Sequence, residues 1–150
     1  MDEIDVKILK LVQEDARLTP VEIAPLVHLS RTPVAARLRK LRQEGVIRSF
    51  ISVLDRQLIG QPVLVITHVK LEKQSTEYFN DFENAVCQMP EVQFLLHVSG
   101  GWNFILHITA KSPQAYFDFI MENINALGNI AHMESCFVMK ECKSNGPFKL

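Results

Sequence analysis

The chain has 150 residues, enough for one or two small domains, and its hydrophobic content of 47% is ample for ordinary packed cores. Its net charge of −1 argues against a uniformly basic nucleic-acid binder, but residues 1–54 carry nine Lys and Arg against seven Asp and Glu, whereas residues 55–150 carry seven against ten. Only the first part of the chain is therefore suited to face a polyanion such as DNA.

Cysteine usage and hydropathy narrow the class of protein further. The three cysteines, Cys87, Cys136 and Cys142, match neither a disulfide framework nor a zinc pattern. No signal peptide opens the chain, and no apolar run approaches the roughly 20 residues that a membrane helix needs. We therefore expect a soluble cytoplasmic protein with no membrane contact, no metal and no cofactor.

Two helices are predicted before residue 30. The first begins at Asp2, a residue type that caps helices, and is expected to bury Ile4, Ile8, Leu11 and Val12. The second begins with the sequence TPVE at residues 19–22, which combines a capping threonine, a proline at the first helical position and a glutamate that can reach back. Pro25 lies inside this second helix, where it removes a backbone hydrogen bond and can kink or shorten the helix.

The third predicted helix, residues 31–42, carries five cationic side chains and no acidic one, with Ser30 before it as an N-cap. Val34, Leu38 and Leu41 share one apolar stripe. About three residues separate this helix from the second, as in a helix-turn-helix motif, in which the second helix of the pair enters the major groove of DNA. On this helix alone, a charged face that is merely solvated is an equal alternative. Gly45 ends the helix, and residues 46–54 are predicted to form an extended strand.

The residues predicted to contact DNA lie on this third helix. Arginine can make bidentate contacts with guanine, while contacts to phosphate set the register and the salt dependence of binding. Arg37 and Arg42 are assigned to phosphates, although Arg37 also lies at the edge of the apolar stripe, where anchoring the helix is an equal alternative. The full predicted set is Arg31, Thr32, Ala36, Arg37, Arg39, Lys40, Arg42 and Gln43.

Residues 63–150 are predicted to follow the order βαββαβ. The expected strands span 63–71, 92–99, 103–110 and 130–140, and the expected helices follow Ser75 and Ser112. The last helix is expected to bury Phe117, Ile120, Ile124 and Leu127. This order is typical of a ferredoxin-like domain, in which one antiparallel sheet carries two helices on one face.

The other face of this sheet is not polar enough to lie in water, because each strand carries hydrophobic residues at its odd and its even positions, and therefore on both faces. Such a face predicts burial against a second copy of the chain in a two-fold dimer. His68, His97 and His107 are expected to share this open face, with His132 on the fourth strand. They are interpreted as polar interface residues rather than metal ligands, because no second-ligand motif accompanies them.

An ordered set of motifs runs through the chain: Asp2-x-x-Asp5-x-x-Ile8-Leu9, Leu29-Ser30, Arg37-Leu38-x-x-Leu41-x-x-x-Gly45-Val46-Ile47, Leu54-Asp55 and Gly60. This set resembles the leucine-responsive regulator/AsnC family of small bacterial and archaeal transcription factors. The family usually has an ordinary helix former where this chain has Pro25.

The resemblance implies an α+β protein in two domains. Residues 1–49 would form a winged helix-turn-helix domain, residues 50–62 a strand and linker, and residues 63–150 a ferredoxin-like domain for ligand binding and oligomerisation. The implied function is a sequence-specific regulator of transcription rather than an enzyme. It would bind double-stranded DNA as a homodimer, and dimers of the family often assemble into larger rings such as octamers.

The resemblance also implies a small amino-acid-like effector, bound between C-terminal domains near a turn of the type Gly-acidic-x-Asp. This chain has Gly100-Gly101-Trp102-Asn103 there, so both acidic positions are neutral. A desolvated ammonium group favours a carboxylate partner. The alternatives are thus an amino acid held differently, with the Asn103 amide oxygen and the Glu134 charge as contacts, a less cationic ligand, or no ligand. The predicted effector-binding residues are Ser99, Gly100, Gly101, Trp102, Asn103, Glu134 and Ser135.

An enzyme is the second hypothesis. Sirohaem decarboxylases resemble this two-domain fold, and Trp102-Asn103-Phe104 is weakly similar to a Tyr-Asn-x-Trp-Phe stretch in their corresponding strands. The basic third helix has no role in tetrapyrrole chemistry, which favours the regulator.

Overall fold

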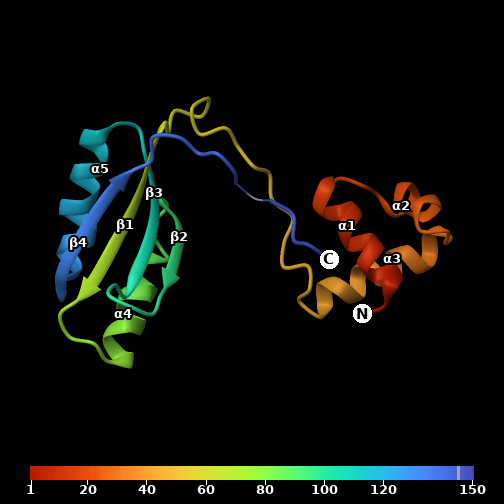
Figure 1. Ribbon diagram of the computed structural model, residues 1–150, viewed down its shortest axis with the longest axis horizontal. Coiled ribbons are helices and arrows are strands. Elements are labelled where there is room, and N and C mark those ends of the chain that lie inside the picture. Colours follow the sequence, from red (N-terminus) through yellow and green to blue (C-terminus); the bar gives the residue numbers. More distant parts are fainter. Residues whose placement is uncertain (145) are drawn as a thin grey trace. The chain divides into compact units, whose positions relative to one another are not determined.

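The structure is a computed structural model that describes residues 1–144 and 146–150. It divides the chain into two compact units (Figure 1). The first comprises Met1–Val53 and Cys142–Leu150, and the second comprises Leu54–Glu141, so the chain passes between the units twice. Three helices in the first unit and a helix-covered sheet in the second confirm the predicted α+β class.

The first unit is built from α1 (Glu3–Glu14), α2 (Pro20–Leu26) and α3 (Arg31–Gln43). Each helix turns its apolar stripe inward, which removes that surface from water and holds the three together. The buried core comprises Ile8, Leu9, Val12, Ile23, Ala24, Val27, Val34 and Leu41.

Helices α1 and α2 begin with reciprocal capping boxes. The Asp2 carboxylate accepts from the backbone N–H of Asp5 at 2.9 Å, and the Asp5 carboxylate accepts from that of Asp2 at 3.0 Å. Thr19 and Glu22 make the same exchange at α2, as the sequence predicted. Ser30 has the extended backbone of an N-cap, but its side chain makes no capping hydrogen bond.

Helix α2 runs through Pro25 and ends one residue later. His28 then adopts the left-handed region at φ 56°, which is unusual for a residue other than glycine. The backbone N–H of His28 donates to Pro25 O at 3.4 Å, and that of Leu29 donates to Ala24 O at 3.0 Å. These bonds close the turn that leads into α3.

The strand expected over residues 46–54 is absent: residues 46–62, all of which the structure describes, contain no strand. The apolar pattern there is real, but a strand needs a neighbour to pair with its backbone groups. Ile51 and Val53 are 74% and 68% exposed, so this segment of the single chain has no such neighbour.

The second unit is a four-stranded sheet with two helices on one face. Its elements are β1 (Val63–Leu71), α4 (Thr76–Val86), β2 (Val92–His97), β3 (Phe104–Ala110), α5 (Pro113–Phe119) and β4 (Ile130–Phe137). All pairs are antiparallel in the order β2-β3-β1-β4. This is the ferredoxin-like arrangement predicted from the order of elements.

Helix α5 continues as a π-helical turn, Ile120–Ile124, and a short 3-10 turn, Asn125–Leu127. Residues Tyr116, Phe119, Ile120 and Ile124 are the ones that enter the core. The predicted burial of Phe117 and Leu127 is wrong, because these side chains are 57% and 37% exposed. A π-turn takes an extra residue per turn, so a regular helical stripe cannot be extended through it. None of the described helices is long and apolar enough to cross a membrane.

Candidate nucleic-acid interface and effector surface

Helix α3 presents a polar stripe to solvent. Thr32, Ala36, Arg39 and Gln43 follow one another at spacings of four, three and four residues, so they lie on one side of the helix. The opposite side is fixed in the core by Val34 and Leu41. Seven of the eight residues predicted to contact DNA are exposed, and they are Arg31, Thr32, Ala36, Arg39, Lys40, Arg42 and Gln43.

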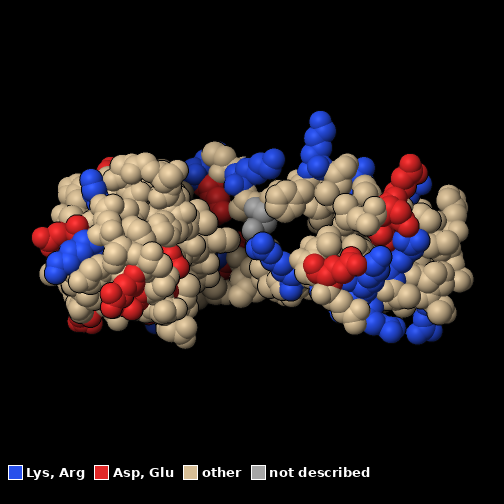
Figure 2. Space-filling model, turned by 90° about the horizontal axis from the view of Figure 1, so that it is seen from below, with Lys and Arg blue, Asp and Glu red and all other residues tan. Residues whose placement is uncertain are grey.

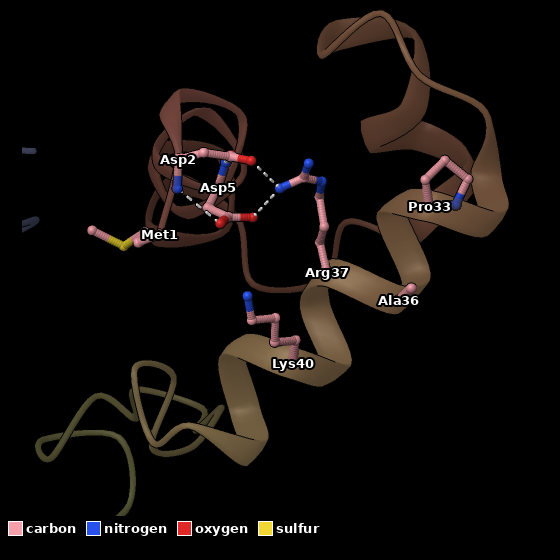
Figure 3. Close-up of a pocket in the computed structure, with 7 residues that line it drawn as sticks. All are labelled: Met1, Asp2, Asp5, Pro33, Ala36, Arg37 and Lys40. Atoms are coloured by element: carbon pink, nitrogen blue, oxygen red, sulfur yellow. Dashed lines mark hydrogen bonds and ion pairs between the residues drawn. The ribbon is translucent and has the colours of Figure 1, made fainter.

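Arg37 is the exception, because it points back toward α1 (Figure 3). Its Nη1 lies 2.7 Å from Asp2 Oδ2 and 2.7 Å from Asp5 Oδ1. Asp5 is only 4% exposed, so this ion pair joins α3 to the first turn of α1 at the edge of the core. The geometry favours the anchoring alternative for Arg37 over a contact with phosphate.

The same contacts perturb the ionisation of both carboxyls. The pKa of Asp2 is lowered, first by the backbone N–H of Asp5 and then by Arg37. Burial alone would raise the pKa of Asp5, but the backbone N–H of Asp2 and the Arg37 guanidinium outweigh it and hold that pKa below its usual value. Both groups are thus carboxylates at neutral pH, as the ion pair requires.

A hollow lies between the start of α1 and α3, and the ion pair forms part of its wall (Figure 3). Its lining residues are Met1, Asp2, Asp5, Pro33, Ala36, Arg37 and Lys40. Both of its carboxylates are already engaged by Arg37, and Lys40 is the other charged residue in its lining.

The other cations of α3 are held loosely. Lys40 Nζ is 3.8 Å from Glu44 Oε1, and the guanidinium carbon of Arg42 lies 4.6 Å from the ring centre of Phe50. Exposed ion pairs of this kind contribute little to stability, so Lys40 can exchange Glu44 for another anion. Within the described residues, Arg31 and Arg39 form no ion pair. We refer to the first unit as the helical unit and to the second as the sheet unit. Lys and Arg side chains gather over the helical unit and are fewer over the sheet unit (Figure 2).

The turn between β2 and β3 contains Ser99 to Asn103, and Asn103 is engaged inside the fold. Its Oδ1 accepts from the backbone N–H of Leu71 at 2.8 Å, and its Nδ2 donates to Gln74 Oε1 at 3.4 Å. Asn103 is 9% exposed. The amide oxygen that we expected to accept from an effector is therefore occupied by the β1–α4 connection. The relevant partners are about 30 residues away along the chain, so no local pattern could have revealed them.

Glu134 and Ser135, the two predicted effector residues on β4, lie on opposite faces of the sheet. In the antiparallel pairing of β4 with β1, Glu134 lies directly opposite His68, and both residues lie on the open face. Ser135 faces the helices, where its Oγ lies 2.5 Å from the hydroxyl of Tyr116, which in turn lies 2.8 Å from Thr67 Oγ1. The structure thus does not bring all seven predicted residues to one surface of the single chain.

Three imidazoles occupy the open face, but they are not the three that the sequence suggested. His68, His107 and His132 lie there, since residues paired across strands share a face. The prediction for His97 is wrong: it lies opposite the fully buried Phe104, with the two ring centres 4.7 Å apart and the rings tilted by 40°. Its Nδ1 lies 2.9 Å from Glu83 Oε1 on α4.

Trp102 stands at the end of the open face between two of these imidazoles. Its ring stacks on His132 at 5.3 Å with an interplanar angle of 17°, and it lies 5.5 Å from the ring of His68. Among the described residues, His68 Nδ1 is buried without a hydrogen-bond partner. No group of three or more His, Cys, Asp or Glu in the described part of the chain is arranged to hold a metal ion.

Two family models match successive parts of the chain. Residues 1–48 match a model described as winged helix-turn-helix DNA-binding, and residues 64–148 match one described as the Lrp/AsnC ligand binding domain.

Named relatives match nearly the whole length. The chain is 32% identical to a leucine-responsive regulatory protein of Rhizobium meliloti over 95% of this chain and 92% of the relative. It is 31% identical to a Bkd operon transcriptional regulator of Pseudomonas aeruginosa over 93% and 92%. A transcriptional regulator of Neisseria meningitidis, solved as a complex with L-methionine, is 26% identical and superposes with a TM-score of 0.91 over 99% of this chain and 96% of that one.

Proposed function

The chain belongs to the Lrp/AsnC family of transcriptional regulators, and on that premise we propose that α3 is the helix with which it reads DNA. Its relatives are named regulators of transcription rather than enzymes, so the chain is a DNA-binding regulator and the decarboxylase alternative has no support. The observation that carries the proposal is the exposed stripe of α3, whose other side is fixed in the core.

We assign different roles to the residues of this helix. Thr32, Ala36, Arg39 and Gln43 would face base edges in the major groove, since they share the stripe opposite the core. The flanking cations Arg31, Lys40 and Arg42 would hold phosphates. Arg37 would contribute by fixing the angle between α3 and α1 through Asp2 and Asp5.

Salt dependence tests this assignment. Each phosphate contact contributes about 0.9 to the slope of log affinity against log salt concentration. The double variant Lys40→Gln/Arg42→Gln should therefore flatten the slope by about 1 to 2 and weaken binding to specific and random duplexes alike. The matched control is Lys73→Gln/Lys111→Gln, which removes the same charge from the sheet unit. An unchanged slope in the α3 variant would place the DNA elsewhere.

We also propose that the open face of the sheet is the surface of a homodimer. It carries apolar side chains that no helix covers, including Phe94 and Leu96, which are 56% and 47% exposed. The partnerless nitrogen of His68 suits a face completed by another molecule. The unpaired apolar segment over residues 46–54 would gain a strand neighbour in the same assembly. A dimer also places two α3 helices for two half-sites.

Sedimentation tests the dimer. The wild-type chain should sediment as a dimer or larger at micromolar concentration, whereas Leu96→Glu should shift it toward monomer because a charge would be buried at the contact. A control variant, Phe117→Glu, puts the same charge on the exposed side of α5. A wild-type monomer at micromolar concentration would refute the proposal.

Finally, we propose a small amino-acid-like effector for the second unit. The match to a ligand binding domain and the L-methionine complex of the Neisseria regulator support this class of ligand. Trp102 and Glu134 are its proposed contacts, because they lie at the open face while Asn103 serves the fold. Calorimetry against the twenty amino acids should find at least one that binds, and Glu134→Gln should weaken it. If none of the twenty amino acids gave a binding signal, a less cationic ligand or no ligand would be favoured.

A further inference from the structure

The segment that follows β4 does not stay with the sheet unit. Cys142–Leu150 belongs to the helical unit, together with Met1–Val53. We refer to its described residues, Cys142–Ser144 and Gly146–Leu150, as the C-terminal arm. In Figure 1 the arm ends beside α1. After β4 the chain thus returns to the unit that contains α1, α2 and α3.

A clasp of two hydrogen bonds holds the arm on α1. The backbone N–H of Phe148 donates to Gln13 Oε1 at 2.8 Å, and Gln13 Nε2 donates to Phe148 O at 3.5 Å. A single amide side chain thereby engages both backbone groups of Phe148. The Phe148 side chain is itself 82% exposed, so apolar burial is not what attaches the arm.

The arm changes the charge of the unit on which it lies. Residues 1–53 carry nine Lys and Arg against seven Asp and Glu, a net charge of +2. The arm adds Lys143 and Lys149 and no acidic residue, which raises the unit to +4. Within the described structure neither lysine forms an ion pair, and both are exposed.

The clasp holds the arm on a side of α1 that carries another exposed lysine. Lys149 directly follows the clasped Phe148, and Lys10 is exposed one helical turn before Gln13 on the same side of α1. Exposed lysines without ion-pair partners attract a polyanion that binds across this side of α1. The phosphate backbone of duplex DNA is the polyanion that this unit already meets.

We propose that the C-terminal arm is a basic accessory arm that contacts DNA phosphates beside the helix-turn-helix and adds affinity without sequence preference. The proposal rests on the DNA-binding function of the first unit. It gives Lys143 and Lys149 the role of phosphate contacts and Gln13 that of a positioning residue that keeps the arm on α1.

The test is fluorescence anisotropy of the full chain with a labelled 30-base-pair duplex of random sequence, measured from about 50 to 200 mM salt, the range over which such contacts are resolved. Lys143→Gln/Lys149→Gln should flatten the log–log salt slope by about 1.8, at 0.9 per lost contact. Lys73→Gln/Lys111→Gln, which removes equal charge from the sheet unit, should retain the wild-type slope. Gln13→Ala keeps every charge but removes the clasp, and should also weaken binding.

The outcomes separate this proposal from the function on which it rests. A wild-type slope in Lys143→Gln/Lys149→Gln would overturn the arm, and so would an equal loss in the control pair, because net charge alone would then explain it. Wild-type affinity in Gln13→Ala would overturn the clasp. The DNA-binding function itself would fail only if the wild-type chain bound no duplex, and circular dichroism confirms that each variant is folded.

Discussion

The hydroxyl chain between α5 and the sheet yields a quantitative prediction. Tyr116 OH lies between Thr67 Oγ1, at 2.8 Å, and Ser135 Oγ, at 2.5 Å. Thr67 is fully buried, whereas Ser135 is exposed and can take water as a partner. Replacing Tyr116 by Phe therefore leaves one hydroxyl, that of Thr67, fully buried without its hydrogen-bond partner. An unsatisfied buried group of this kind costs about 1 to 3 kcal/mol.

A double-mutant cycle separates this cost from loss of packing. Thr67→Val alone should cost less than Tyr116→Phe, because the tyrosine hydroxyl keeps its bond to Ser135. In the double variant neither hydroxyl is present, so its loss of stability should be about 1 kcal/mol or more below the sum of the single losses. Ser135→Ala should cost less than about 0.5 kcal/mol, as exposed substitutions do.

Urea unfolding followed by tryptophan fluorescence measures these values. Trp102 is the only tryptophan and lies in the sheet unit, so the signal reports the unit that contains the substitutions. In thermal unfolding, each kcal/mol should lower Tm by about 4 to 8 °C for a domain of this size. Additive losses in the cycle, or a Tyr116→Phe loss as small as that of Ser135→Ala, would refute the reasoning.

Three further predictions concern backbone and buried polar groups. His28→Gly should stabilise the helical unit by about 0.5 to 1 kcal/mol, because glycine accepts φ 56° without strain. Urea unfolding followed by circular dichroism of the helices measures this change, and a loss of stability would contradict the prediction. The hydrogen bonds of Asp5 lower its pKa despite burial, so its contribution to the free energy of unfolding is present above the ordinary carboxyl range and is lost as pH falls below that range. Arg37→Gln should lower the free energy of unfolding at pH 7 and weaken its dependence on acid pH. An unchanged dependence on acid pH would count against the ion pair. Asn103→Leu leaves the buried N–H of Leu71 unpaired and should cost about 1 to 3 kcal/mol by Trp102 fluorescence, whereas Asn103→Asp keeps an acceptor there and should cost less.

Much of the fold could be predicted from patterns of residues that are close together in the sequence. The cap at Asp2 and the capping box at Thr19 were predictable because cap and partner are only three residues apart, and the structure contains both; the reciprocal bond from Asp5 was not predicted. Strand alternation in β1 and β3 was equally readable, since each buries alternate residues against the same two helices. The order of helices and strands along the chain, three helices followed by βαββαβ, was predicted from the same patterns.

Long-range contacts were not readable in the same way. Asn103 accepts a hydrogen bond from Leu71, 32 residues away, and Arg37 pairs with Asp5, also 32 residues away, so neither contact follows from a local pattern. The face of His97 depended on the register between β2 and β3, which is irregular between Val92 and Phe94. A pattern of alternation gives two faces but does not say which one meets the helices.

The net charge of −1 is the sum of a positively charged unit and a negatively charged one. With its C-terminal arm the helical unit carries eleven Lys and Arg against seven Asp and Glu, while the sheet unit carries five against ten. Salt weakens contacts between the first unit and phosphates, because bound counterions must be displaced. Salt would have no such effect on the proposed burial of the apolar open face, because that burial depends on removing hydrocarbon from water. If the open face forms the proposed homodimer, rising salt should therefore release the DNA before it separates the two subunits.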